Sequence, residues 1–419
     1  MAAADSGGQL ARRKPATARG DGAAAAAAAP GTPPPPPAGG ARAAGATGVE
    51  AEGKKTKGRF KKAGRTVLQG VRAIDQLKSI RLSIINVPFR RRLQTFCTAL
   101  WLFMIPCGTL AMWCITVLAL LWPLTCVPTA LYLLFIFSWD KRSITGTTPQ
   151  LLRYSIVWDN VADYFPIELR KTVDLDPGRK FVFGYHPHGV ISMGALINFA
   201  TDATGFAQLF PGLSVHVMTL RSNFLTPLLR EFILHMGICE ASLKACHTIL
   251  KQGNGSAIML AVGGAAEALD ARPGSIELTL AKRKGFVRVA VATGASLVPV
   301  FSFGENELWN ALPNPEGSNL RKLQNAMKKS FKFTFPAIHG RGLFNYDFGW
   351  MPHRRKIVSV VGRPIDIEEA YTGDLYSGEG AALVDTIHAQ YIQGLRELFE
   401  ANKAAVGIPG MENQTLVIK

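Results

Sequence analysis

The sequence predicts an α/β fold in which a mostly parallel sheet is flanked by helices, preceded by an N-terminal membrane hairpin and a disordered N-terminal tail. Three observations support this prediction. After Arg153, short β-rich runs alternate with helical stretches, which is typical of βαβ crossovers. From Leu93 to Trp139 no residue is charged, as expected of a membrane segment. Residues 1–58 are dominated by Ala, Gly and Pro.

The tail, residues 1–58, is expected to be disordered because it has almost no apolar side chains to bury. It contains arginines and few acids, as targeting peptides do. However, Asp5, Asp21 and the prolines from Pro33 to Pro37 fit neither a secretory apolar region nor an amphipathic presequence. Import into an organelle is therefore only a minor alternative.

Residues 59–92 are predicted to be a basic amphipathic segment beside the membrane. The net charge of +17 first suggests nucleic acid, but lysines and arginines crowd between Lys54 and Arg92, just before the apolar run. Basic residues beside a membrane span normally face the cytosol and attract anionic lipid. Apolar spacing between Val67 and Ile85 predicts a short helix on the membrane surface. Before Gly64, a solvated tail explains the charge equally well.

Residues 93–139 are predicted to form a membrane-embedded hydrophobic hairpin. One bilayer crossing needs ~20 apolar residues, so this run is long enough for two. Pro123 and Pro128 lie between the apolar halves Leu100–Trp122 and Thr129–Trp139, and such breakers favour a hairpin over one helix. Basic residues on both flanks predict that both ends are cytosolic. Two full spans, a re-entrant hairpin and a buried helix pair in a soluble protein are the alternatives.

The globular domain is expected at residues 150–410. Its strands are predicted at Phe181–Tyr185, Val215–Leu220, Ala257–Val262, Ser296–Phe301 and Ile357–Val361. Its helices are predicted at Ser192–Thr204, Pro227–Met236, Leu243–Gln252, Phe286–Thr293, Leu320–Phe331 and Gly380–Ala405. In parallel sheets of this kind, sites form at the carboxyl ends of the strands.

His186 and His188 stand at the carboxyl end of the first predicted strand, on either side of Pro187. Imidazole is the usual general base near neutral pH, and backbone N–H groups after Gly189 suit a developing oxyanion. From the spacing alone, a core histidine with an exposed neighbour is equally compatible. The other histidines form no recognisable metal-ligand motif with this pair, so no metal is expected.

Two further motifs hold polar candidates. The segment Ala261–Glu267 is a strand that runs into two glycines, which permit close backbone approach, and then a carboxylate. Glu267 is a candidate partner for a histidine, although a solvent-facing glutamate on a tight turn explains the motif equally well. Arg283 and Lys284 open a predicted helix, and Arg341 lies in a Gly-rich turn. These residues are candidates for phosphate contacts, while a solvated positive face is the commoner explanation.

The order of the motifs resembles the type-2 diacylglycerol acyltransferase family, which includes monoacylglycerol and wax-alcohol acyltransferases. The resemblance runs from about Arg92 to about Pro409. The motifs that carry it are Tyr164-Phe165-Pro166, His186-Pro187-His188-Gly189, Val262-Gly263-Gly264-Ala265-Ala266-Glu267, Arg283-Lys284-Gly285-Phe286, Phe303-Gly304-Glu305-Asn306 and His339-Gly340-Arg341-Gly342.

The resemblance implies an enzyme of the endoplasmic reticulum membrane, also found on lipid droplets, that esterifies a neutral acceptor with acyl-CoA. Its globular domain would face the cytosol and would be related to the glycerolipid acyltransferases. Those relatives use a His-x4-Asp site, but here Met193 follows His188 at that spacing and Ile191 follows His186. Glu267 is therefore the best remaining carboxylate for this role.

On this basis His188 is expected to remove the proton from the free hydroxyl of diacylglycerol, while Glu267 orients its imidazole. His186 and backbone N–H groups after Gly189 would shape the site or bind the oxyanion. Contacts with CoA phosphates are assigned to Arg283, Lys284 and Arg341.

The expected partners are acyl-CoA as co-substrate, diacylglycerol and membrane lipid. No tightly bound cofactor and no nucleic acid are expected, and homo-oligomerisation is left open. A monoacylglycerol or a long-chain alcohol is the alternative acceptor. Two alternatives from other classes are a lipid-droplet scaffold protein that needs no histidine chemistry and a basic nucleic-acid-binding protein.

Overall fold

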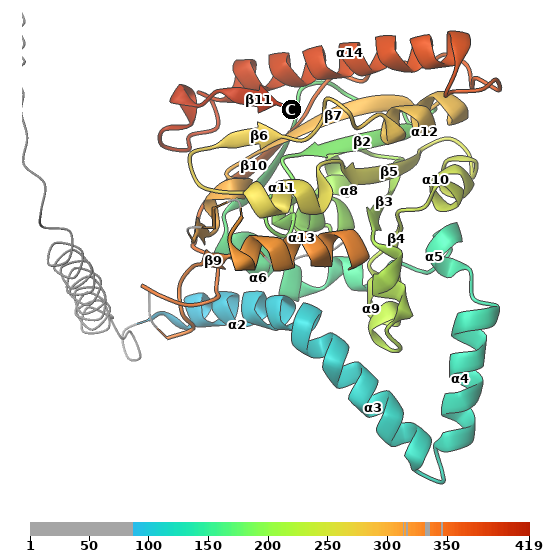
Figure 1. Cartoon of the computed structure of the whole chain (residues 1–419), viewed down its shortest axis with the longest axis vertical. Coiled ribbons are helices and arrows are strands. Elements are labelled where there is room, and N and C mark those ends of the chain that lie inside the picture. Colours follow the sequence, from blue (N-terminus) through green and yellow to red (C-terminus); the bar gives the residue numbers. More distant parts are fainter. Residues whose placement is uncertain (1–86, 313, 316, 332–335, 345–346) are drawn as a thin grey trace, which may run out of the picture. The chain divides into compact units, whose positions relative to one another are not determined.

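The computed structural model describes residues 87–419 except 313, 316, 332–335 and 345–346 (Figure 1). All of these residues belong to one structural unit of the chain, Ile74–Lys419. The predicted tail at 1–58 and the predicted surface helix at 67–85 lie outside the described residues.

A seven-stranded mixed sheet forms the centre of the domain, in the order β1-β10-β7-β2-β5-β3-β4. Neighbouring strands pair in parallel except β10 and β7, which are antiparallel. The predicted mostly parallel sheet is therefore confirmed, and each of the five predicted strands is present within two residues at either end. Strands β1 and β4 were not predicted. The strands are β1 (Ile167–Lys171), β2 (Phe181–His186), β3 (Ser214–Thr219), β4 (Ile238–Glu240), β5 (Ser256–Ala261), β7 (Ser296–Phe303) and β10 (Ile357–Val361).

Helices cover both faces of the sheet, and alternate strand residues point to opposite faces. On one face, Val182 and Ile258 pack with α10 (Leu243–Leu250), α12 (Gly285–Thr293) and α14 (Gly378–Asn402). On the other face, Phe183 and Met259 pack with the π-helical turn Leu196–Ala200 and α8 (Phe206–Leu209). In Figure 1, α14 runs above the sheet and α6 (Ile156–Tyr164) lies below it.

Shorter elements complete the domain. The predicted helix at Ser192–Thr204 is shorter than expected, because it begins at Met193 and leaves helical geometry at Thr201. Strand β11 pairs in parallel with β6, so the fold continues past the predicted boundary at residue 410. The remaining elements are α5 (Arg142–Thr145), α7 (Met193–Ala195), α9 (Leu229–His235), α11 (Gly264–Asp270), β6 (Ile276–Leu278), β8 (Asn310–Ala311), α13 (Asn319–Phe331), β9 (Ile338–His339) and β11 (Leu416–Ile418).

The apolar run forms three helices, α2 (Phe89–Phe103), α3 (Thr109–Leu121) and α4 (Cys126–Ser138). The chain bends by 53° between Phe89–Phe103 and Pro106–Leu121, where a π-helical turn contains Pro106, a common cause of kinks. Pro123 lies in the break between α3 and α4. The interpretation of Pro128 as a second breaker is wrong, because it lies in the first turn of α4, where its missing N–H has no helical partner to lose.

Within the described part of the chain, no single helix is both long and apolar enough to cross a bilayer. The bent pair Phe89–Phe103 and Pro106–Leu121 meets that test by length and composition. Figure 1 shows α3 and α4 extending away from the sheet. Their large exposed apolar side chains are Leu110, Trp113, Ile115, Val117, Leu118, Leu121, Val127, Leu131, Leu134, Phe135 and Phe137.

Both ends of the helical hairpin are fixed to the domain. Trp101 of α2 meets Trp158 of α6 edge to face, with ring centroids 5.5 Å apart. Just beyond α4, the carboxylate of Asp140 lies 2.6 Å from the guanidinium of Arg230, and both side chains are buried. A buried pair of this kind is costly to break, by about 3–5 kcal/mol. The base of the hairpin is therefore held in one place on the sheet domain.

Candidate active site

Three parallel strands bring the candidate residues to one edge of the sheet. Strand β2 lies between β5 and β7, and it is parallel to both. Their carboxyl ends therefore lie at the same edge, where sites of open α/β sheets form. His186 ends β2, Glu267 follows β5 and Glu305 follows β7. The sequence thus predicted the correct edge for the histidine motif and Glu267.

The hydrogen bond of His188 fixes which ring nitrogen carries the lone pair. Its Nδ1 lies 3.0 Å from the carbonyl oxygen of Gly189. A carbonyl only accepts, so in the neutral ring Nδ1 carries the hydrogen and Nε2 the lone pair. Nε2 makes no hydrogen bond with any described residue. Burial lowers the pKa of His188, although the bond to Gly189 opposes this, so the ring is a neutral base at neutral pH.

Glu267 binds the backbone of His188 rather than its ring. One carboxylate oxygen accepts the N–H of His188 at 2.8 Å, and the other accepts the N–H of Thr279 at 2.7 Å. Burial raises the pKa of Glu267, and these hydrogen bonds partly offset the rise. The expected role of Glu267 in orienting the imidazole is therefore corrected: Gly189 fixes the tautomer, and Glu267 fixes the main chain that carries the ring.

The expected close backbone approach in the glycine pair is confirmed at Gly263. A Cβ added there would lie 1.8 Å from the carboxyl carbon of Glu267, far inside any van der Waals contact. Glycine at this position therefore leaves the space in which the Glu267 carboxylate reaches His188.

His186 is fully buried, and its ring is hydrogen-bonded within the core. Its Nε2 lies 3.0 Å from the hydroxyl oxygen of Tyr391, and that hydroxyl lies 3.0 Å from the carbonyl of Gly184. Because the carbonyl takes the hydroxyl hydrogen, the Tyr391 oxygen accepts from Nε2–H of His186. Burial lowers the pKa of His186 to about 3. His186 is thus a neutral ring, and its single N–H donates to Tyr391 inside the core. Of the two roles expected for His186, this arrangement is compatible with shaping the site but leaves no N–H for an oxyanion.

The predicted phosphate ligands lie in different surroundings. Arg283 is exposed, and its charge acts on Glu267 to lower the pKa of that carboxyl. Lys284 forms a 2.5 Å ion pair with Asp385 on α14, where both groups are partly exposed. Exposed pairs of this kind are weak, and the phosphate contact of Lys284 stays a prediction.

Arg341 is not part of this cluster of charges. It is buried, its guanidinium stacks 5.9 Å from the centre of the Tyr164 ring, and its Nε donates to the carbonyl of Gly342 at 3.2 Å. The guanidinium of Arg341 therefore contacts α6 through Tyr164, and its assignment to a phosphate stays a prediction.

Sequence reasoning missed Glu305, although it stands in one of the quoted motifs. This carboxyl is buried, and it accepts the N–H of Met193 at 2.6 Å, the N–H of Gly194 at 3.0 Å and the hydroxyl of Tyr185 at 2.9 Å. Burial raises its pKa to about 7, and the hydrogen bonds oppose the rise. A carboxylate two residues after a mostly apolar strand was the signal that pointed to it.

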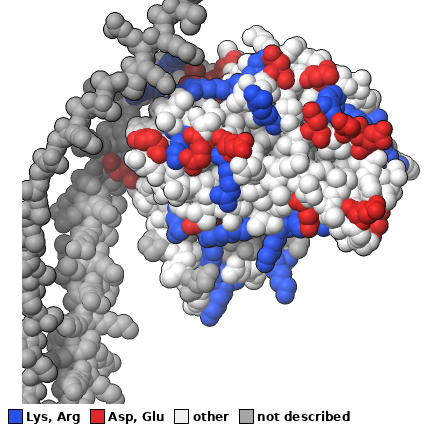
Figure 2. Space-filling model, turned by 90° about the horizontal axis from the view of Figure 1, so that it is seen from above, with Lys and Arg blue, Asp and Glu red and all other residues white. Residues whose placement is uncertain are grey.

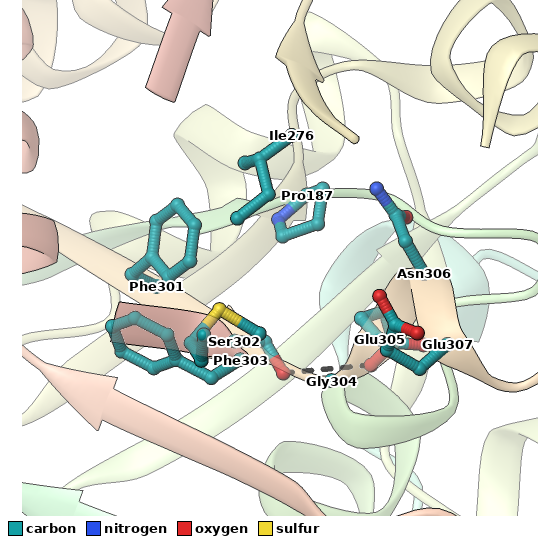
Figure 3. A pocket seen from close by; sticks show the side chains of 10 residues that line it. Pro187, Ile276, Phe301, Ser302, Phe303, Gly304, Glu305, Asn306 and Glu307 are labelled. Atoms are coloured by element: carbon teal, nitrogen blue, oxygen red, sulfur yellow. Dashed lines mark hydrogen bonds between the residues drawn. The ribbon is translucent and has the colours of Figure 1, made fainter. Parts of the chain in front are cut away.

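A small pocket opens beside the histidine motif (Figure 3). Pro187 and Ile276 lie on one side of it, and Glu305 and Asn306 lie further along its wall. The dashed line in Figure 3 joins Glu305 and Ser302, 3.5 Å apart. The cavity volume is about 10 Å³, room for about one water molecule and far below the ~300–1,000 Å³ of typical ligand pockets. The pocket in this structure is therefore too small for an acyl chain.

The described residues contain no group of three or more His, Cys, Asp or Glu side chains placed to hold a metal ion. Figure 2 shows one face of the molecule, where lysines and arginines are interspersed with acids. That face offers no continuous basic stripe of the kind that tracks a nucleic-acid backbone.

The chain belongs to the diacylglycerol acyltransferase family, whose pattern matches residues 114–419, and the resemblance seen in the motifs is thereby confirmed. Diacylglycerol O-acyltransferase 2A of Umbelopsis ramanniana is 42% identical over 79% of this chain and 92% of the relative. Diacylglycerol O-acyltransferase 2 of Dictyostelium discoideum is 44% identical over 76% and 94%. The 2-acylglycerol O-acyltransferase 1 of Bos taurus is 39% identical over 81% and 99%.

Among solved structures, the chain is similar to the 1-acyl-sn-glycerophosphate acyltransferase of Thermotoga maritima. The TM-score is 0.33 at 13% identity, and the match covers 74% of this chain and 97% of that one. This likeness is too distant to inform the site.

Proposed function

We propose that this protein transfers the acyl group of acyl-CoA to the free hydroxyl of diacylglycerol and forms triacylglycerol. Two supports are the family membership and the names of the relatives, which are diacylglycerol O-acyltransferases. The observation that carries the chemistry is the tautomer of His188, whose bond to Gly189 leaves the lone pair at Nε2.

In the proposed reaction, Nε2 of His188 takes the proton of the acceptor hydroxyl as its oxygen attacks the thioester carbonyl carbon. The carbonyl oxygen becomes an oxyanion while the new C–O bond forms. The oxyanion then re-forms the carbonyl, the C–S bond breaks and CoA leaves as a thiolate. A thiol has a pKa of about 8.5, so the thiolate needs no strong acid and takes its proton from the imidazolium or from water.

The proposed oxyanion donors are backbone N–H groups in the turn that follows His188. The N–H of Ser192 binds the carbonyl of His188, and those of Met193 and Gly194 bind Glu305. Among the described residues, no hydrogen bond occupies the N–H groups of Gly189, Val190 or Ile191. We therefore assign the proposed oxyanion donors to the N–H groups of Gly189, Val190 and Ile191.

Replacing His188 by Ala tests the base. A positioned base contributes about 10²–10⁴-fold, so His188→Ala should lose that much triacylglycerol synthesis in isolated membranes while it remains membrane-associated. His247→Ala on α10 is the matched control and should retain activity. Near-normal turnover in His188→Ala would refute the assignment of the base.

The acceptor is tested separately, because a 2-acylglycerol O-acyltransferase is also among the relatives. Expression in a host that lacks triacylglycerol synthesis, followed by chromatography of the neutral lipids, should show triacylglycerol. Accumulation of diacylglycerol or wax ester instead would assign the chain to monoacylglycerol or a long-chain alcohol.

We further propose that the enzyme works at the endoplasmic reticulum membrane and on lipid droplets, with α3 and α4 embedded in the bilayer and the sheet domain in the cytosol. The support is the set of exposed apolar side chains on these two helices together with the basic flanks at Arg90–Arg92 and Lys141–Arg142.

A further inference from the structure

Glu305 connects the end of one strand to the turn that follows the histidine motif. It lies two residues after the end of β7, with a side chain that is almost completely buried. Its two oxygens accept the N–H groups of Met193 and Gly194, which form the first turn of α7. The third donor is the hydroxyl of Tyr185, which belongs to β2, the strand that carries the histidines.

The turn is packed directly onto this carboxyl. Gly189 has a left-handed backbone, with φ at +60°, and a Cβ added there would lie 2.6 Å from Cγ of Glu305. At Gly194, an added Cβ would lie 2.8 Å from Oε2 of Glu305 and 2.3 Å from the Tyr185 hydroxyl. All three distances are shorter than a Cβ contact allows, so glycine at these two positions lets the main chain reach the carboxyl.

Two glutamates therefore hold the turn from opposite ends. Glu267 binds the N–H of His188 at its start, and Glu305 binds the N–H groups of Met193 and Gly194 at its end. Between them, Ser192 closes the turn with its N–H and its hydroxyl, which bind the carbonyl of His188 at 3.1 and 2.8 Å. The N–H groups of residues 189–191 lie in the part of the turn that these contacts enclose.

We propose that Glu305 is a positioning residue for acyl transfer: by binding the N–H groups of Met193 and Gly194, it fixes the turn that carries His188 and the proposed oxyanion donors. This inference rests on the proposed function. Glu305 does not contact the reacting atoms in this scheme. It acts through the main chain, and displacement of a reacting group by about 1 Å costs on the order of 10²-fold in rate.

Glu305→Gln is the variant of choice because it keeps the shape and one accepting oxygen. The amide group of glutamine presents N–H where the carboxylate accepted, so at least one of the two backbone N–H groups loses its partner. Because burial holds the pKa of Glu305 at about 7, the fold already accommodates a neutral carboxyl at this position. Tyr185 is the titratable group in contact with it, and no ion pair of the described residues includes it.

Glu240→Gln is the matched control. Glu240 is also a buried glutamate at the carboxyl end of a strand, β4, but it binds the hydroxyls of Ser143 and Ser242 at the far edge of the sheet. Both variants replace a buried carboxyl at the carboxyl end of a strand, and of the two only Glu305 contacts the turn.

The experiment measures kinetics and amide hydrogen exchange of the full-length variants in detergent micelles. Glu305→Gln should lower kcat by about 10²-fold, with KM for acyl-CoA within about threefold, and exchange should become faster in the peptide that covers residues 187–196. Glu240→Gln should change neither quantity. A kcat within twofold of the wild type, or lost activity with unchanged exchange at residues 187–196, would overturn the proposal.

The same exchange data distinguish a local effect on the turn from global unfolding. Faster exchange throughout the sheet in Glu305→Gln would show a merely structural role for Glu305 and would also overturn the proposal. Failure of the proposed function has a different signature. In that case the wild type forms no acyl ester, or His188→Ala keeps its turnover. Wild-type synthesis with an inactive His188→Ala and a fully active Glu305→Gln would reject only the positioning role.

Discussion

His186 and His188 are two residues apart, yet their hydrogen bonds give them different chemistry. His186 donates its N–H to Tyr391 inside the core, whereas His188 donates to Gly189 and keeps a lone pair at Nε2. The residue types and their spacing could be predicted from the sequence. The hydrogen bonds that distinguish the two rings could not, because one of them depends on a partner as distant as Tyr391, which reaches His186 only in the folded chain.

The pH dependence of kcat/KM tests the base at the residue scale. Burial lowers the pKa of His188 below its usual 6.5, and only the neutral ring accepts a proton. Activity limited by this group should therefore persist below pH 6.5 and fall as the pH drops through the lowered pKa. A separate transition near pH 7 in the pH profile of kcat/KM would belong to Glu305 and should vanish in Glu305→Gln. A transition at or above 6.5 that survives in that variant would contradict the assignment to His188.

Tyr391→Phe tests the structural role of His186. The change removes the acceptor that the buried N–H of His186 uses, and it removes a donor to the carbonyl of Gly184. An unsatisfied buried group costs about 1–3 kcal/mol, so the free energy of unfolding should fall by at least that amount in denaturant titrations. Tyr154→Phe removes an exposed hydroxyl and should have almost no effect. Equal stability of the two variants would exclude the proposed hydrogen-bond chain.

At the scale of elements, the strand-to-helix turns decide the geometry of the site. The five predicted strands and most helices could be read from apolar runs and their periodicity, because burial of those runs is a local property of the sequence. Strand β4 has three residues and α11 has seven, and β1 contains Glu168, Arg170 and Lys171, so these elements lack a clear apolar run and escaped prediction. Glu267 lies in α11, and its contact with His188 was predicted, but only the structure shows that it binds the backbone N–H and not the ring.

Two glycine-to-alanine changes separate local packing from helix propensity. At Gly263 the new Cβ would meet the carboxyl of Glu267 at 1.8 Å, so Gly263→Ala should displace that group from His188 and lower kcat by about 10²-fold. Gly394 lies within α14 with no atom near its added Cβ, and Gly394→Ala should raise stability by ~0.5–1 kcal/mol without loss of activity. Assays of melting and turnover check both, and an active Gly263→Ala would contradict the packing argument.

At the scale of the whole molecule, the site edge of the sheet and the apolar hairpin belong to one fixed body. The hairpin is tied to α6 through Trp101 and to α9 through Asp140 and Arg230, so a bilayer that holds α3 and α4 also orients the sheet domain. This arrangement suits an enzyme whose acceptor is a membrane lipid and whose acyl donor is soluble.

Cysteine accessibility tests the membrane placement. Cys114 on α3 is exposed on the protein itself, so any shielding must come from lipid. A membrane-impermeant maleimide should label Cys114 in microsomes only after detergent is added. Ser377→Cys, at the exposed start of α14, should be labelled in both conditions when the domain is cytosolic. Equal labelling of Cys114 with and without detergent would exclude insertion of α3.

The sequence by itself determined the α/β class, the apolar hairpin, the histidine motif at a strand end and the family, because each depends on local composition or on ordered short motifs. Only the tertiary structure decided that Glu267 binds the backbone N–H of His188, that His186 is a core residue and that Glu305 holds the turn between them and α7. Those features depend on single hydrogen bonds between segments 79 to 205 residues apart. Such contacts leave no periodic signal in a sequence, since they arise when three parallel strands bring their carboxyl ends to one edge.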